Sequence, residues 1–216
     1  MGQFTKVTEH YFTKIPSSKI RKYKFKVFIR GVELIIVSES GVFSAKKLDK
    51  GTEVLAKYMR IEENWKILDL GCGYGVLGIV AAKLAPRGYV VLTDINKRAV
   101  KLAKINIKLN NIKNAEVRWG DLYEPVKNET FDTVVSNPPI SAGLKVCYKI
   151  IEKAPRHLVE GGLLQIVARH KKGGRRLMDK MIEVFGNCEI IAREAGYCIY
   201  VSRNLHKNKL HFSSIN

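Results

Sequence analysis

The chain has 216 residues, 46% of them hydrophobic, which suits one well-buried domain with an appendage and is too short for two full domains. Lys and Arg outnumber Asp and Glu by 38 to 20, and a net charge of +18 favours a polyanionic partner, with a merely lysine-rich surface as the alternative. No apolar stretch reaches the roughly twenty residues of a membrane span, and residues 1–10 hold no apolar signal core, so we expect a cytoplasmic protein.

The cysteines indicate neither a metal site nor a disulfide. They form no Cys-x-x-Cys pair and have no histidine at metal-ligand spacing, so we expect no bound metal. If Ala195-Gly196 turns a hairpin, Arg193 lies opposite Cys198 and Cys188 lies too far along the strand to bond with it. We therefore expect reduced thiols at positions 72, 147, 188 and 198.

The first predicted elements are a β-hairpin and a helix. Residues 24–37 alternate in part and break at Gly31, which is typical of two antiparallel strands with lysines on the outward face of the first. Such lysines either protect the strand edge from aggregation or contact RNA, and the pattern favours neither. An amphipathic helix is expected from Thr52 to Met59.

The chain is organised around an apolar run, Ile67 to Leu70, which ends in glycines at positions 71, 73, 75 and 78. This pattern predicts a strand, a tight turn and a helix, with a ligand lying against the turn and the helix N-terminus. Gly73 to Gly78 also fits the Gly-x-Gly-x-x-Gly fingerprint of dinucleotide-binding proteins. However, the carboxylate of Asp69 would repel a pyrophosphate and attract a cationic amino-acid group, which favours S-adenosylmethionine.

Two later strands end in residues that suit a nucleoside. Residues 88–94 are apolar and end in Asp94, whose carboxylate can accept both ribose hydroxyls of either cofactor. Residues 115–122 predict a third strand that ends in Gly120-Asp121, which alone would pass as an ordinary turn.

A fourth strand, Phe131 to Ser136, ends in Asn137-Pro138-Pro139-Ile140. Two successive prolines cannot continue a ladder or begin a helix interior, so we expect the backbone carbonyls around them to remain free acceptors. Taken alone, Asn-Pro-Pro would be a strand terminator.

The remaining elements alternate between helix and strand. Helices are expected over 95–110, 143–158 and 177–185, and strands over 163–168, 189–193 and 197–203, the last two as an antiparallel hairpin. Gly161-Gly162 would form the turn before the first of these strands. The basic segment 169–176 is expected to be a loop at the sheet edge that carries Asp69 and Asn137, where it suits RNA phosphates or is only a solvated loop.

Five segments together resemble a known family: His10-Tyr11-Phe12, Gly41-Val42-Phe43-Ser44, Lys50-Gly51-Thr52, Asp69-Leu70-Gly71-Cys72-Gly73-Tyr74-Gly75 and Asn137-Pro138-Pro139-Ile140. In them the chain is similar to the class I methyltransferases, and among these to archaeal relatives of the bacterial ribosomal RNA guanine-N2 methyltransferases, a small-methyltransferase-domain family. The similarity extends over nearly the whole chain.

The resemblance implies roles for individual residues. S-adenosylmethionine would be bound by Asp69, Gly71, Cys72, Gly73, Tyr74, Gly75, Asp94, Ile95, Gly120, Asp121, Leu122 and Asn137, with Thr52 in a segment over the site. The Asn137 side-chain oxygen and the Pro138 carbonyl would accept both hydrogens of a target NH2 group, with Pro139 and Ile140 completing the catalytic motif. The candidates for RNA contact are Phe43, Lys171, Lys172, Arg175 and Arg176.

Ile140 departs from the family pattern, because amino-methyltransferases commonly carry an aromatic residue there that stacks on the target base. Stacking would be apolar or come from elsewhere, with Phe43 or Tyr11 as candidates. Phe43 is equally compatible with a place in the core.

We therefore expect an α/β fold with a doubly wound, mostly parallel, Rossmann-like sheet over residues 50–203, a C-terminal antiparallel hairpin, a β-rich N-terminal extension over 1–49 and a basic tail over 204–216. The expected function is methyl transfer from S-adenosylmethionine to an exocyclic amine of an RNA base, above all guanine N2 in ribosomal RNA. The alternatives are cytosine N4, adenine N6, a protein glutamine amide, nicotinamide-dependent oxidoreduction and a non-catalytic role in ribosome assembly.

Overall fold

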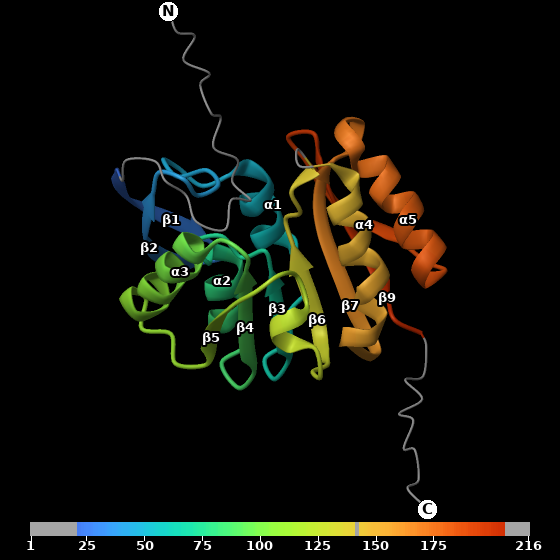
Figure 1. Ribbon diagram of the computed structural model, residues 1–216, viewed down its shortest axis with the longest axis horizontal. Coiled ribbons are helices and arrows are strands. Elements are labelled where there is room, and N and C mark those ends of the chain that lie inside the picture. The colour runs from blue at the N-terminus through green and yellow to red at the C-terminus, as the bar shows by residue number, and fades with distance from the viewer. Residues whose placement is uncertain (1–20, 141–142, 206–216) are drawn as a thin grey trace, which may run out of the picture.

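The centre of the fold is a seven-stranded sheet with strand order β5-β4-β3-β6-β7-β9-β8 (Figure 1). The computed structural model describes residues 21–140 and 143–205. The strands are β3 Lys66–Leu70, β4 Tyr89–Asp94, β5 Ala115–Trp119, β6 Phe131–Ser136, β7 Leu158–Arg169, β8 Glu189–Glu194 and β9 Tyr197–Arg203. Strand β9 pairs antiparallel with β7 on one side and β8 on the other, whereas the pairs that join β5, β4, β3, β6 and β7 are parallel. The predicted Rossmann-like sheet and C-terminal hairpin are confirmed, with Arg193 opposite Cys198.

Each face of the sheet has its own core, because successive side chains of a strand point to opposite faces. Ile67 of β3 packs in the core that contains α1 Lys50–Tyr58, α2 Val76–Leu84 and α3 Lys97–Leu109. Leu68 and Leu70 pack on the opposite face with α4 Leu144–Lys153 and α5 Arg175–Phe185. The alternation therefore covers both faces with helices, as a doubly wound sheet requires.

The N-terminal hairpin forms as predicted, from β1 Lys22–Ile29 and β2 Val32–Glu39. Its two-residue turn, Arg30-Gly31, has positive φ at both positions, which matches the right-handed twist of the strands. The lysines at 22, 24 and 26 are exposed on one face of β1, and Val27 and Ile29 of the other face join the core of α1 to α3. The hairpin is thus packed on the sheet domain.

Asn106 of α3 and Asn110, the residue that ends this helix, bind the free edge of β2. The Asn106 side chain accepts from the Val37 amide at 2.8 Å and donates to the Val37 carbonyl at 2.9 Å. Asn110 makes the same pair of bonds with Ile35, at 2.9 Å each. Asn106 also donates to the Tyr74 carbonyl at 2.8 Å, so α3 ties the hairpin to the glycine-rich turn.

Two predicted boundaries were wrong in the segment before β7. The helix ends at Lys153 and a 3-10 turn, Ala154–His157, follows, because Pro155 has no N–H to continue the helix. Strand β7 begins at Leu158, before the glycines rather than after them. The pairing with β6 is irregular between Leu158 and Leu163, where Gly161 has a φ of +79° and a Cβ on Gly162 would lie 3.0 Å from the Val159 carbonyl oxygen, so the two glycines allow a bulge within the strand.

The basic segment is also more ordered than the predicted loop. Residues 170–174 form a short turn with a kink at Lys172 and Gly173, whose backbone angles are not helical, and α5 begins at Arg175 rather than at Leu177. Arg175 and Arg176 therefore lie in the first turn of a helix.

Within the described ranges, no helix is long and apolar enough to cross a membrane, and no three His, Cys, Asp or Glu side chains gather as metal ligands would. All four cysteines are free thiols. The short helix Glu124–Val126 between β5 and β6 completes the fold.

Candidate active site

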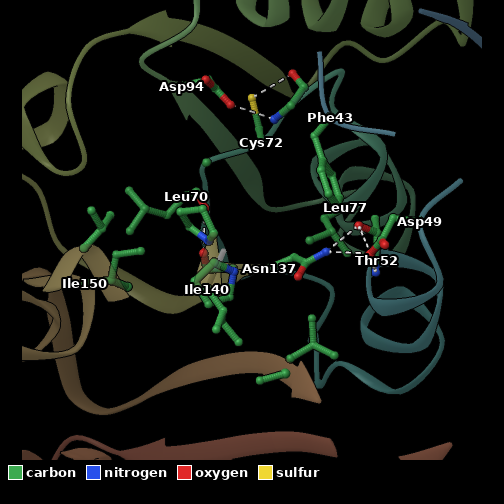
Figure 2. Close-up of a pocket in the computed structure, with 18 of the residues that line it drawn as sticks. Phe43, Asp49, Thr52, Leu70, Cys72, Leu77, Asp94, Asn137, Ile140 and Ile150 are labelled. Atoms are coloured by element: carbon green, nitrogen blue, oxygen red, sulfur yellow. Dashed lines mark hydrogen bonds between the residues drawn. The ribbon is translucent and has the colours of Figure 1, made fainter. Parts of the chain in front are cut away.

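A cavity of about 510 Å³ opens at the carboxyl ends of β3, β4, β6 and β7, a size typical of small-molecule sites (Figure 2). Four strand ends reach its wall: Leu70, Thr93, Ser136 and Ala168. Polar groups at this edge face one space because parallel strands end together there.

The glycine-rich turn between β3 and α2 forms one wall. Gly71, Gly73 and Gly75 have φ of +74°, +56° and +93°, a conformation that side chains rarely adopt. The Gly71 and Cys72 amides both donate to the Thr93 carbonyl at 2.9 Å, which fixes the turn against β4. Gly71, Cys72, Gly73 and Tyr74 line the cavity, whereas Gly75 lies behind them.

Asp94 holds this wall from the end of β4. Its side chain is 3% exposed, and its two carboxylate oxygens accept from the Gly73 and Asn96 amides, both at 2.8 Å. Asp94 also lines the cavity, so a ligand hydroxyl can approach the same carboxylate that holds the turn.

Asp69 lies behind the turn and does not line the cavity. It is fully buried, and one carboxylate oxygen accepts from the Gly78 amide at 2.8 Å. No described residue donates to the other oxygen. Burial, opposed by that bond and reinforced by the nearby Asp94 charge, raises the pKa of Asp69 to about 7.

The end of β5 contributes to the far part of the cavity. Asp121 and Leu122, which follow β5, line it together with Ile95, which follows β4, and Asp121 is exposed. Gly120 does not line the cavity. A Cβ there would lie 2.4 Å from the Pro125 ring, so the lack of a side chain lets this turn pack against Pro125.

Asn137 extends from β6 toward the N-terminus of α1 (Figure 2). Its amide nitrogen donates to an Asp49 carboxylate oxygen at 2.8 Å and to the Thr52 hydroxyl at 2.9 Å. A carboxylate can only accept, so the NH2 end of the amide must face Asp49 and the amide oxygen must face away. None of the described residues donates to that oxygen.

The expectation that the carbonyls around the prolines are free was wrong for Pro138. The Ile140 amide donates to the Pro138 carbonyl at 2.9 Å, closing a tight turn. A carbonyl oxygen has two lone pairs, so one acceptor position remains. Pro138, Pro139 and Ile140 all line the cavity.

Phe43 lies over the cavity rather than in the core. Its side chain is 45% exposed and lines the cavity (Figure 2). The Asn96 side chain donates to the Gly41 carbonyl at 3.1 Å, and the Tyr74 hydroxyl donates to the Ser44 carbonyl at 3.3 Å. The segment that carries Phe43 is thus fixed to the cavity wall. Tyr11, the other candidate for stacking, lies outside the described residues.

The basic candidates separate into two groups. Lys172 lines the cavity, while Lys171, Arg175 and Arg176 are exposed beside it and do not line it.

These features are shared with known proteins. The family model described as the methyltransferase small domain matches residues 33–201. The chain belongs to this methyltransferase family. Among relatives, it is 34% identical over 201 residues to the uncharacterized protein YbxB of Bacillus subtilis, covering 92% of this chain and 100% of that protein.

Other relatives in the family have names that state an activity. The chain is 36% identical over 187 residues to the ribosomal RNA small subunit methyltransferase C of Hamiltonella defensa, with 85% of this chain and 52% of that protein covered. The T. thermophilus 16S rRNA N2 G1207 methyltransferase, solved with AdoMet and guanosine, superposes with a TM-score of 0.74 at 25% identity, covering 87% of this chain and 52% of that one. The chain spans about half the length of these named methyltransferases.

Asp49 and Tyr197 line the cavity although the sequence did not predict them as site residues, and Arg169, from the predicted basic segment, lines it as well. The Arg169 guanidinium lies 4.9 Å from the centre of the Tyr197 ring, a cation–π contact at the wall near α1. The sequence does contain a signal for Asp49, because an aspartate three residues before Thr52 fits the N-cap pattern of a helix. That pattern predicts the cap and not the contact with Asn137.

Proposed function

We propose that this methyltransferase transfers the methyl group of S-adenosylmethionine to the exocyclic amine of an RNA base, above all N2 of guanine in ribosomal RNA. The observation that carries the proposal is the amide of Asn137, held by Asp49 and Thr52 so that its oxygen is the polar atom left for a ligand. An exposed oxygen of this kind accepts from N–H donors, which an exocyclic amine supplies.

The residues of the cavity suit S-adenosylmethionine, which supplies an electrophilic methyl group on a sulfonium. Asp94 and Asp121 offer carboxylates for hydroxyl and amine donors, and Gly71 to Tyr74 offer bare backbone. Asp69 lies behind the turn, where its carboxyl group accepts from the Gly78 amide and holds the start of α2 against the glycine turn.

The protein's own part in the reaction is to position the acceptor. With one N–H held by Asn137 and the other by the remaining lone pair of the Pro138 carbonyl, the lone pair of the amine nitrogen is directed at the methyl group. The same two oxygens stabilise the positive charge that develops on this nitrogen. A neutral amine needs no strong base for this step, and the structure offers none at Asn137.

The names of the relatives and the net positive charge of the chain both support ribosomal RNA as the substrate. The net charge of +18 and the cations beside the cavity, Lys171, Lys172, Arg175 and Arg176, suit phosphate contacts. The target base must leave its stack to reach Asn137 at the cavity wall. Phe43, fixed over the cavity, offers an aromatic face for that base in place of the family aromatic that Ile140 replaces.

The test is incubation with methyl-labelled S-adenosylmethionine and unmodified total RNA, followed by nucleoside mass spectrometry of separated ribosomal and transfer RNA. We expect label in N2-methylguanosine from ribosomal RNA. Label in N4-methylcytidine or N6-methyladenosine would retain the mechanism and replace the base. Absence of label in RNA, with S-adenosylmethionine binding intact by calorimetry, would contradict the proposal and leave a protein amide or an assembly role.

A further inference from the structure

We propose that Asp49 and Thr52 are positioning residues for methyl transfer: they lock the Asn137 amide in the one orientation that presents an oxygen, and so make the site selective for acceptors that carry N–H. This inference rests on the proposed function and assigns to Asp49 and Thr52 a role toward the acceptor rather than toward the cofactor.

The amide nitrogen of Asn137 has two hydrogens, and each has its own acceptor. One is directed at Asp49 Oδ2, 2.8 Å away, and the other at Thr52 Oγ1, 2.9 Å away. Rotation of the amide by half a turn would place its oxygen against the Asp49 carboxylate, two acceptors with no proton between them. The lock therefore specifies the orientation as well as the position.

Asp49 is itself held in place by the helix it begins. Its Oδ2 accepts from the Thr52 backbone amide at 2.9 Å, the capping bond of α1, and from the Thr52 hydroxyl at 3.4 Å. One carboxylate oxygen thus joins the helix N-terminus to the end of β6, across 88 positions of sequence.

Gly51 leaves the space that this arrangement needs. A Cβ at Gly51 would lie 3.0 Å from Asp49 Oδ2 and 2.9 Å from Cε1 of the Tyr197 ring. Any side chain would push against the oxygen that holds Asn137. Gly51 and Thr52 of the Lys50-Gly51-Thr52 segment are therefore explained by their contacts with Tyr197, Asp49 and Asn137, whereas Lys50 pairs with Glu53 and Glu194.

The charge of Asp49 also acts on the reaction through the amide. As the amine lone pair forms the new N–C bond, the C–S bond breaks with its electron pair left on sulfur, so the positive charge passes to the amine nitrogen, which then releases a proton to water. A carboxylate bound to the NH2 end of Asn137 polarises the amide and makes its oxygen a stronger acceptor for that developing charge.

Matched substitutions separate this role from a structural one. Thr52→Val keeps the shape and the backbone amide but removes the hydroxyl, and Thr52→Ser restores it. Asp49→Ser keeps an N-cap but is too short to reach Asn137. We expect kcat for RNA to fall about 5- to 10-fold in Thr52→Val and about 10- to 100-fold in Asp49→Ser, in line with the loss of one neutral and one charged hydrogen bond.

Two results decide the test: which kinetic constant the substitutions change, and whether that change is still seen when Asn137 is absent. We expect S-adenosylmethionine affinity by calorimetry and KM for RNA to stay near wild type, Thr52→Ser to recover most of the rate, and neither substitution to lower kcat further when added to Asn137→Ala. Glu53→Ala, in the same helical turn and outside the cavity lining, controls for disturbance of α1. A weakened cofactor affinity with unchanged kcat, or an equal loss of rate in the Asn137→Ala background, would overturn the proposal.

A measurement without turnover keeps this test separate from that of the proposed function. In ¹⁵N spectra, the side-chain NH2 signals of Asn137, identified by their absence in Asn137→Ala, should exchange slowly with water in the wild type and rapidly in Thr52→Val and Asp49→Ser. If the wild type methylates no RNA, the proposed function fails while these spectra still decide the orientation of the amide. Unchanged exchange in both variants would refute the lock.

Discussion

The two sides of the cavity are built in different ways. On the cofactor side, the turn from Gly71 to Tyr74 is held by backbone bonds to β4 and by Asp94, all within about thirty positions of sequence. On the acceptor side, the orientation of Asn137 depends on side chains of α1 that are 85 and 88 positions away. A backbone cradle is specified by glycines and strand ends, whereas an oriented amide needs tertiary contacts.

We therefore expect substitutions on the cofactor side to change the free energy of unfolding or the affinity for S-adenosylmethionine. Substitutions on the acceptor side should change kcat. Four experiments test this, beginning with the largest expected effect.

The first concerns Asp69, behind the glycine turn. Its pKa is raised by burial from 3.8 to about 7, so the folded protein binds this proton more tightly than the unfolded chain. The protonated Asp69 therefore stabilises the fold fully below about pH 4. Its contribution to the free energy of unfolding declines from about pH 4 and is lost as the pH rises through about 7, by up to about 4 kcal/mol in total. Urea unfolding at a series of pH values should show this decline in the wild type relative to Asp69→Asn, where the position does not titrate.

A constant difference between wild type and Asp69→Asn across that range would mean that Asp69 remains ionised in the fold. The buried oxygen without a described partner would then need another explanation.

Asn137→Ala tests the acceptor side directly. It removes an acceptor that acts on the target amine, so kcat should fall about 10²- to 10³-fold, as for loss of other preorganised catalytic groups. Calorimetry should find S-adenosylmethionine affinity near wild type, because the glycine turn and Asp94 are untouched. Loss of cofactor binding in this variant would break the division between the two sides.

Asp94→Ala should show the reverse pattern. It leaves the Gly73 and Asn96 amides without their acceptor and removes a cavity carboxylate, so the dissociation constant of S-adenosylmethionine should rise about 10- to 100-fold. Asp121→Ala is the matched comparison, since its exposed carboxylate lines the cavity and accepts no bond from the turn. We expect a smaller rise there, and an equal rise would show that Asp94 does not hold the turn.

The smallest effect is expected from Arg175→Ala combined with Arg176→Ala. Each cation that contacts a phosphate contributes about 0.7 to 0.9 to the slope of log affinity for RNA against log salt, so the slope should flatten by about 1 to 2. Lys83→Ala with Lys113→Ala is the control, because Lys83 in the last turn of α2 and Lys113 just before β5 are exposed and do not line the cavity. If both pairs flatten the slope equally, binding is a matter of total charge, and the first turn of α5 has no special part in it.

Local patterns were sufficient for the fold and for the cofactor side. The strand, glycine turn and helix around Gly71 follow from apolar periodicity and the need for positive φ, and the hairpin turn at Arg30-Gly31 follows from the same reasoning. The predicted element boundaries were wrong where a packing contact decided them. At Gly162, the lack of a side chain lets neighbouring backbone approach within β7.

The sequence by itself determined the Rossmann-like sheet, the family and the chemical types at each strand end, because periodicity, glycine and proline act over a few residues. Only the tertiary structure decided that Asp69 is buried away from the cavity, that Pro138 has one acceptor position already used, and that Asp49 orients Asn137. The first and the last of these outcomes depend on which distant segments meet at the edge of the sheet and on how much water their burial removes, whereas the Pro138 bond depends on the local path of the backbone after β6.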